Sequence, residues 1–92
     1  MDNQRAIITV VGKDTIGIIA KVCTYLADNS INILDISQTI VQDFFNMMMI
    51  VDLSRTNKPF DIIAGELSDV GVHTGVQIKC QLEGIFDKMH RI

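Results

Sequence analysis

Two glycines and an aspartate separate a strongly apolar segment from an amphipathic one near the start of the chain. Residues 7–22 read IITVVGKDTIGIIAKV, with Gly12, Asp14 and Gly17 at the junction. Glycine allows the sharp turn with which a strand can end, and the first amides of the following helix have no partner inside that helix. These amides and the helix dipole attract a carboxylate or a phosphate. The junction therefore predicts a main-chain site for a small anion.

The side chain of Asp14 is expected to serve the helix first. An aspartate at such a position accepts a hydrogen bond from an amide of the first turn, here that of Ile16 or Gly17. Capping by Asp14 leaves the backbone amides as the better ligand donors, with Gly17 inside the first turn and without a Cβ to obstruct them. Lys13 is expected to be solvated.

Four strands and two helices are predicted around this junction. The strands are expected at residues 5–11, 31–41, 44–53 and 75–82, and the helices at residues 15–28 and 59–71. β-Branched and alternating residues indicate the strands, and apolar residues three or four apart indicate the helices. Right-handed crossovers place the first and third strands at the centre of the sheet and both helices on one face. The predicted fold is α+β, a ferredoxin-like βαββαβ sandwich with a four-stranded antiparallel sheet.

The second strand is predicted to start irregularly. Its apolar residues change parity between Ile33 and Leu34, so a break is expected around residues 32–34. Such a break is often a β-bulge, which redirects side chains. The first strand and the third are apolar on both faces, which predicts that the second face of the sheet is also covered.

One domain is expected to span residues 1–92, with its core at about residues 5–82 and a tail at residues 83–92. The tail places Ile85, Phe86, Met89 and Ile92 on one side of a helix, which predicts a short amphipathic helix that covers part of the sheet.

Composition excludes several partners. The 92 residues are 48% hydrophobic and carry a net charge of −3, and the scattered Lys and Arg residues make no basic surface for nucleic acid or an anionic membrane. Without an apolar run of spanning length or a signal-peptide pattern, a cytoplasmic protein is expected. Cys23 and Cys80 are expected as buried free thiols, since neither has a partner at metal-binding spacing.

Other functions of this fold are disfavoured by the residues present. A metal carrier needs two cysteines in the first loop, an RNA-binding version needs exposed aromatic residues on the central strands, and a phosphatase needs an arginine where only Lys13 stands. His73 and His90 are expected at the surface. No nucleophile, base and orienting group occur together, so we expect no catalytic residue, no metal, no cofactor and no enzyme activity.

The chain resembles an ACT domain from about Ala6 to Leu82. The resemblance is carried by residues 11–18 (VGKDTIGI), Val22, Leu26, residues 32–35 (NILD) and residues 51–53 (VDL). It implies that two copies pair side by side or back to back and bind a free amino acid at their interface. Carried onto this sequence, the ligand contacts would come from Gly12, Asp14, Thr15, Gly17 and Ile18 of one copy and from Asn32, Ile33 and Leu34 of the other.

The resemblance and the chemistry of these residues agree. Amides near residues 16–18 can hold an α-carboxylate, and Asp14 or the amide oxygen of Asn32 can accept from the α-ammonium. A second interpretation of Asn32 has equal weight, namely a turn residue that bonds its own backbone.

The function expected from these residues is a non-catalytic, regulatory amino-acid sensor that works as a homodimer or higher homo-oligomer and modulates a partner protein by allosteric regulation. The alternatives are a protein-interaction module without a small-molecule ligand and a small acyl-phosphate hydrolase of the same topology.

Overall fold

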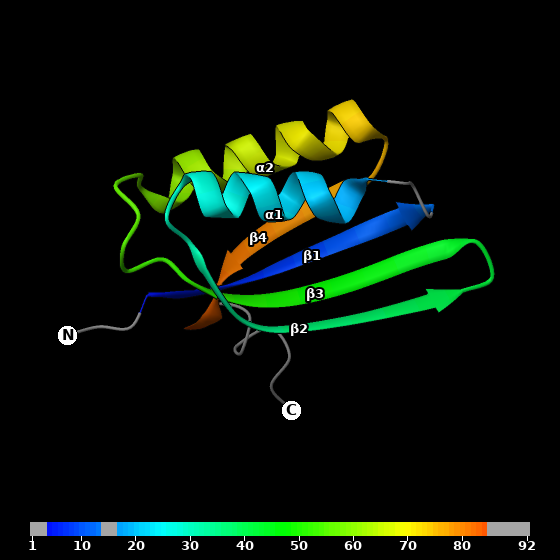
Figure 1. The fold of residues 1–92 in the computed structure, drawn as a ribbon, viewed down its shortest axis with the longest axis horizontal. Helices are drawn as coiled ribbons and strands as arrows, with labels where there is room; N and C mark the ends of the chain where they lie inside the picture. The colour runs from blue at the N-terminus through cyan, green and yellow to red at the C-terminus, as the bar shows by residue number, and fades with distance from the viewer. Residues whose placement is uncertain (1–3, 14–16, 85–92) are drawn as a thin grey trace.

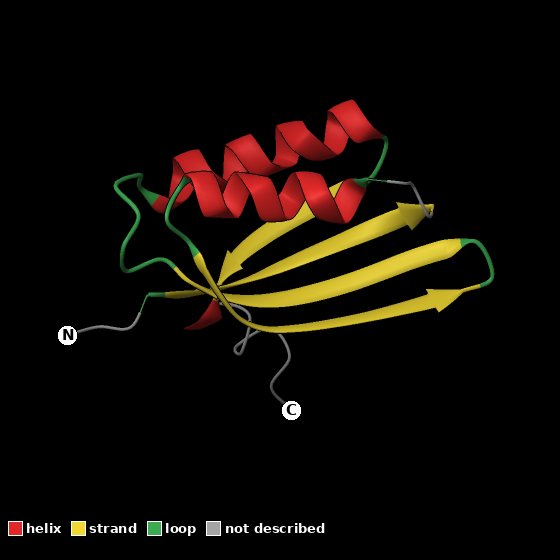
Figure 2. Ribbon diagram, in the orientation of Figure 1, coloured by secondary structure: helices red, strands yellow, loops and turns green. Residues whose placement is uncertain are grey.

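The segments of β-branched and alternating apolar residues form four strands, and the two segments of helical periodicity form helices. The structure is a computed structural model that describes residues 4–13 and 17–84. The order is β1 (Arg5–Lys13), α1 (Ile18–Asp28), β2 (Asn32–Val41), β3 (Phe44–Asp52), α2 (Phe60–Thr74) and β4 (Gln77–Leu82). The strands form one antiparallel sheet in the order β2-β3-β1-β4. Both helices cover the same face of this sheet (Figures 1 and 2). The predicted ferredoxin-like sandwich, with the first and third strands at its centre, is confirmed.

The core lies between the helices and the two central strands. The residues of β1 and β3 that face the helices are buried, and they pack against one apolar stripe from each helix. The main members are Ala6, Ile8, Val10, Phe45, Met47, Met49 and Val51 from the strands, with Ile18, Val22, Leu26, Ile63 and Leu67 from the helices. Aliphatic and Met side chains, together with Phe45, fill this space, and the chain has no tryptophan.

Two predicted helix ends differ from the structure. Gly17 precedes α1 as its N-cap, with a left-handed φ of 91°, and does not lie inside the first turn. The other end of α1 lies at Asp28, as predicted, and Ser30 follows it with a left-handed φ of 60°. Helix α2 continues past Gly71 to Thr74 and ends at Gly75, with φ 81°, so Gly75 caps a helix and does not open a strand.

Gly71 is needed for packing, which explains why it misled the prediction of the helix end. A Cβ on this residue would lie 2.7 Å from the backbone oxygen of Val76 and 3.1 Å from Cγ1 of Ile78. Helix α2 therefore approaches β4 through the bare backbone of Gly71, and the helix itself runs on.

The irregular start of β2 is confirmed as a register shift. Asn32 pairs with Asp52 and Ile33 with Val51, but Asp35 then pairs with Ile50, so Leu34 is the extra residue. Its side chain is 47% exposed. The bulge lies where the sequence predicted it.

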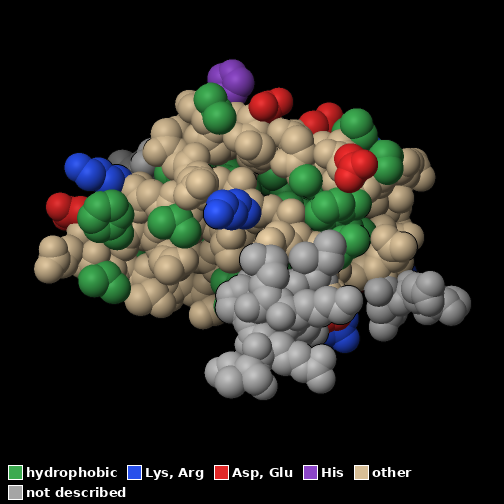
Figure 3. Space-filling model, turned by 180° about the vertical axis from the view of Figure 1, so that it is seen from behind, with side chains coloured by type: hydrophobic (Ala, Val, Ile, Leu, Met, Phe, Trp, Pro, Cys, Tyr) green, Lys and Arg blue, Asp and Glu red, His purple; other side chains and the backbone are tan. Residues whose placement is uncertain are grey.

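The face of the sheet away from the helices carries exposed apolar side chains near the β2–β3 turn. Val11, Phe44 and Met48 are 41%, 57% and 40% exposed. Figure 3, which views the molecule from behind, shows separate apolar side chains at the surface near that end of the molecule, with other surface between them. The predicted tail helix lies for the most part outside the described residues, as do Ile85, Phe86, Met89, His90 and Ile92.

Candidate functional site

The two glycines of the first loop have different tasks. A Cβ on Gly12 would lie 2.8 Å from Cγ1 of Val76, so this glycine allows the end of β1 to pass close to the start of β4. A Cβ on Gly17 would meet no described atom within 4 Å, and the left-handed φ of Gly17 is what requires glycine there. Gly17 is therefore the residue that leaves open space beside the start of α1.

The start of α1 offers main-chain donors. The carbonyl of Gly17 accepts the first helical hydrogen bond, from the amide of Lys21 at 3.0 Å, and the amides before Lys21 in this first turn have no intrahelical partner. The Ile18 side chain is 1% exposed and belongs to the core. Ile18, one of the predicted ligand residues, can therefore contact a ligand only through its backbone. Asp14 and Thr15, with the proposed cap on the amide of Ile16, lie outside the described residues.

The other predicted half of the site is the start of β2. Asn32 is exposed, Ile33 is half-buried on the helix side of the sheet, and Leu34 is the extra residue of the bulge. The side chain of Asn32 makes no hydrogen bond with a described residue, so the turn interpretation, in which it bonds its own backbone, finds no support.

These two halves lie at opposite ends of the sheet. At one end Lys13, which leads into the first loop, pairs with Phe44, which also pairs with Val41. At the other end Asn32 pairs with Asp52, which also pairs with Arg5. The nine residues of β1 span about 30 Å between the two ends at about 3.3 Å per residue. One copy of the chain does not bring Gly12, Gly17 and Ile18 close to Asn32, and Figure 1 shows the start of α1 and the start of β2 at opposite ends of the fold.

A polar hollow lies beside Asn32. It encloses about 680 Å³ and is lined by Ser30, Ile31, Asn32, Asp52 and Arg55. The Asp52 carboxylate accepts hydrogen bonds from the amide of Ser54 at 3.0 Å and from its hydroxyl at 3.1 Å. Arg55 is exposed and forms no ion pair or hydrogen bond with the described part of the chain. Arg55 could not be assigned to this site from the sequence, because only the fold places the loop after β3 beside the start of β2.

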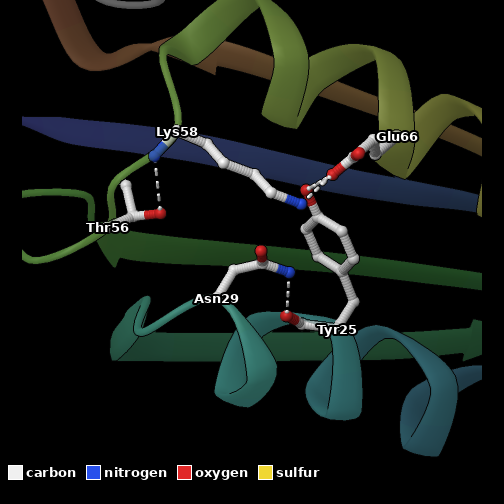
Figure 4. A network of polar contacts seen from close by, with 5 residues as sticks. All are labelled: Tyr25, Asn29, Thr56, Lys58 and Glu66. Atoms are coloured by element: carbon white, nitrogen blue, oxygen red, sulfur yellow. Dashed lines mark hydrogen bonds and ion pairs between the residues drawn. The ribbon is translucent and has the colours of Figure 1, made fainter.

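A second polar cluster joins both helices to the loop that carries Arg55 (Figure 4). The Tyr25 hydroxyl of α1 and the Lys58 ammonium of the loop both donate to Oε1 of Glu66 in α2, each at 2.7 Å. Lys58 Nζ also lies 5.7 Å from the centroid of the Tyr25 ring. The two hydrogen bonds, first that from Lys58, lower the pKa of Glu66, while burial and then the bond to Glu66 raise the pKa of Tyr25. The cluster holds the helices and the loop in a fixed arrangement.

The His, Cys and acidic side chains of the described residues do not gather into a candidate metal site. Residues 4–13 and 17–84 contain no group of three or more His, Cys, Asp or Glu side chains that could hold a metal ion. Cys23 and Cys80 are free thiols and only partly buried; burial raises the pKa of Cys80 to about 11, so its thiol is protonated at neutral pH. His73 is exposed, as predicted, and its Nδ1 lies 2.8 Å from the carbonyl oxygen of Asp69.

No helix among the described residues is long and apolar enough to cross a membrane.

The fold defines a small α+β module. Its accessible polar groups include the main-chain amides at the start of α1 and the side chains of the hollow beside Asn32. The ACT domain family model matches residues 4–81. The chain belongs to the ACT domain family, whose members are regulatory ligand-binding modules. The resemblance inferred from the first loop and the start of β2 is thereby confirmed.

Two similar proteins match this chain along nearly their whole length, and a third matches over about half of its own. A UPF0237 protein of Bifidobacterium longum is 60% identical over 89 residues, which cover 97% of this chain and 99% of that protein. An ACT domain protein from Streptococcus pneumoniae is 40% identical with a TM-score of 0.81, over 94% of this chain and 97% of that one. A putative glycine cleavage system transcriptional repressor shares the fold at 22% identity with a TM-score of 0.77, over 89% of this chain and 47% of that chain.

Proposed function

We propose that this protein is a non-catalytic, cytoplasmic sensor in which a free amino acid binds between two copies of the chain and thereby modulates a partner protein. The separation of the two half-sites supports this proposal most directly. The start of α1 and the start of β2 lie at opposite ends of one sheet, so a ligand that touches both must bridge two copies.

The outer edge of β2 is suited to the second copy. This ten-residue strand lies at the edge of the sheet, where its outward amides and carbonyls have no neighbouring strand. Ile36 and Ile40 lie on the helix-covered face, opposite buried Met49 and Phe45, but they remain 44% and 58% exposed because the helices leave the edge strand uncovered. A long apolar edge strand is normally protected by pairing.

Pairing of two β2 edges about a two-fold axis has a useful geometric consequence. The two strands then run antiparallel, and the start of one lies beside the end of the other. Asn32 of one copy is carried toward Val41 of the other, at the end of the sheet where Lys13 leads into the first loop. The same symmetry that protects the edge therefore brings the two half-sites toward each other.

The ligand contacts follow from the chemistry of the two halves. Main-chain amides at the start of α1 would hold the α-carboxylate, favoured by the helix dipole. The side-chain oxygen of Asn32 from the second copy would accept from the α-ammonium, together with or in place of Asp14. In this proposal Gly12 and Gly17 shape the loop, Ile18 contributes its backbone amide, and Ile33 and Leu34 position Asn32. Thr15 lies outside the described residues and stays a proposed ligand contact.

A thermal-melting screen against the free amino acids tests this function. A ligand of the folded state at about a hundredfold over its Kd stabilises that state by about 2.7 kcal/mol, so the true ligand should raise Tm clearly. If no amino acid shifts Tm, and no amino acid is found in freshly purified protein, the proposal is wrong.

A second candidate is a protein-interaction module without a small-molecule ligand. The exposed apolar residues Val11, Phe44 and Met48 on the face of the sheet away from the helices favour it, because exposed apolar patches often mark a protein contact. The melting screen separates the two candidates, since the interaction module predicts no shift with any amino acid. A small acyl-phosphate hydrolase has no comparable support, and turnover of an acyl phosphate would be needed to revive it.

A further inference from the structure

We propose that Arg55 forms a second anionic subsite beside Asn32, and that the amino acid sensed by this protein carries a carboxylate in its side chain. This inference rests on the proposed function and specifies the class of its ligand. It assigns to Arg55 the recognition of the side-chain carboxylate and leaves the α-carboxylate and α-ammonium to the contacts already described.

The charge of Arg55 is available for a ligand. The side chain is exposed, lines the hollow of about 680 Å³ together with Asn32, and has no partner among residues 4–13 and 17–84. The other charged side chain of the hollow, Asp52, already accepts two hydrogen bonds from Ser54. A guanidinium is suited to such a role because its fork of donors matches the two oxygens of a carboxylate.

The backbone that carries Arg55 is held in place. The amide of Thr56 donates to the carbonyl of Leu53 at 3.3 Å, which closes a turn with Arg55 at its centre. The hydroxyl oxygen of Thr56 then accepts from the amide of Lys58 at 3.3 Å, and Lys58 pairs with Glu66 of α2. Prior ordering of a charged side chain's backbone lowers the cost of binding.

The position of Arg55 beside Asn32 determines which group of the ligand it would contact. If the α-carboxylate lies at the start of α1 in one copy and the α-ammonium at Asn32 in the other, the side chain of the ligand extends past Asn32. The hollow that contains Arg55 adjoins Asn32 on its own subunit, and its volume is within the usual range for small-molecule sites. A carboxylate on that side chain would meet the guanidinium.

Isothermal titration calorimetry with two matched pairs of ligands tests the assignment. Glutamate and glutamine, like aspartate and asparagine, differ chiefly in charge and have nearly the same shape. The unmodified protein should bind the acidic member of the better pair about five- to tenfold more tightly, the range expected for a charge-assisted contact at a partly exposed site. The Arg55→Gln variant should bind both members of that pair equally, and Arg55→Lys should fall between.

A control variant and two further outcomes make the result decisive. Lys21→Gln removes one positive charge from exposed Lys21, which lines a different hollow between α1 and α2, and it should keep the preference for the acidic ligand. Binding of neutral amino acids with no preference for acidic ones, or a preference that persists in Arg55→Gln, overturns this inference and leaves the proposed function standing. Binding of no amino acid at all overturns both.

Discussion

Gly12 and Val76 are in such close contact that a Cβ on Gly12 would lie 2.8 Å from Cγ1 and 3.0 Å from Cβ of Val76. The first glycine of the loop therefore serves the packing of β1 on β4. A Cβ on Gly17, five residues on, would meet no described atom within 4 Å, and the backbone of Gly17 is left-handed. The structure thus gives the two glycines different reasons to be glycine, close packing for Gly12 and backbone conformation for Gly17.

Gly12→Ala should destabilise the fold without a direct effect on ligand contacts. The new methyl group overlaps Val76, and overpacking of this kind costs about 1–3 kcal/mol. Urea denaturation measures the change. Gly65→Ala is the matched control, because Gly65 lies inside α2 with no described atom within 4 Å of an added Cβ, and it should stabilise the protein by about 0.5–1 kcal/mol. Equal destabilisation by both variants would contradict the packing role of Gly12.

Gly17→Ala should lower stability and also abolish the Tm shift that the ligand produces. Its φ of 91° costs an L-residue about 1–2 kcal/mol, and the added methyl group stands beside the amides proposed to hold the carboxylate. Gly75→Ala provides the control, since Gly75 has a similar φ of 81° and equally open surroundings. It should lose a similar amount of stability and keep the ligand-induced shift. Loss of that shift in both variants would assign the effect to stability alone.

Glu66→Gln should matter more at neutral than at acidic pH. The hydrogen bonds from Lys58 and Tyr25 lower the pKa of Glu66 below its ordinary value of 4.5. A carboxyl group with a depressed folded-state pKa contributes stability above its unfolded pKa, and that contribution disappears as the pH falls through the folded-state value. The Tm difference between the unmodified protein and Glu66→Gln should therefore be constant near pH 7 and shrink below pH 4.5. A difference that grows toward acidic pH would exclude the ion pair as its cause.

Cys80 should react slowly with thiol reagents. Burial raises the pKa of its thiol from 9.0 to about 11, so at neutral pH the folded protein holds about a hundredfold less Cys80 thiolate than the unfolded chain. Iodoacetamide labelling of a Cys23→Ser variant, followed by mass spectrometry with and without urea, measures this ratio. Labelling at equal rates in both conditions would contradict the partial burial of Cys80.

The order of the elements and much of the core could be read from the sequence because both depend on local periodicity. Alternation places Phe45, Met47 and Met49 on one face of β3, and the structure shows that this is the face the helices bury. The parity change at Leu34 predicted the position of the bulge. Predictions failed where a glycine acts through tertiary contact. Gly71 resembles a helix end in sequence, but it lies within α2 and against Val76, and only the packed structure reveals this.

The candidate site was less accessible to sequence reasoning. The loop around Gly17 could be recognised from its residue types, but its distance from Asn32 depends on which strands pair. Arg55 stands in an ordinary polar loop, and its place in the hollow beside Asn32 is a product of the sheet order. Asp14 and Thr15 lie outside the described residues, and their contacts remain predictions.

Ile40→Lys should dissociate the proposed dimer and leave the subunit folded. Ile40 is 58% exposed in the single subunit, so a lysine costs the isolated fold little, but in a β2–β2 pair two like charges would face an apolar edge. Light scattering should report a dimer for the unmodified protein at micromolar concentration and a monomer for Ile40→Lys.

Val72→Lys is the control for this experiment, since Val72 is 74% exposed on α2 and lies away from the edge strand; this variant should remain dimeric. Because the two half-sites meet only across the pair, Ile40→Lys should also lose the ligand-induced Tm shift. An unmodified protein that is monomeric with its ligand bound would refute the bridging geometry.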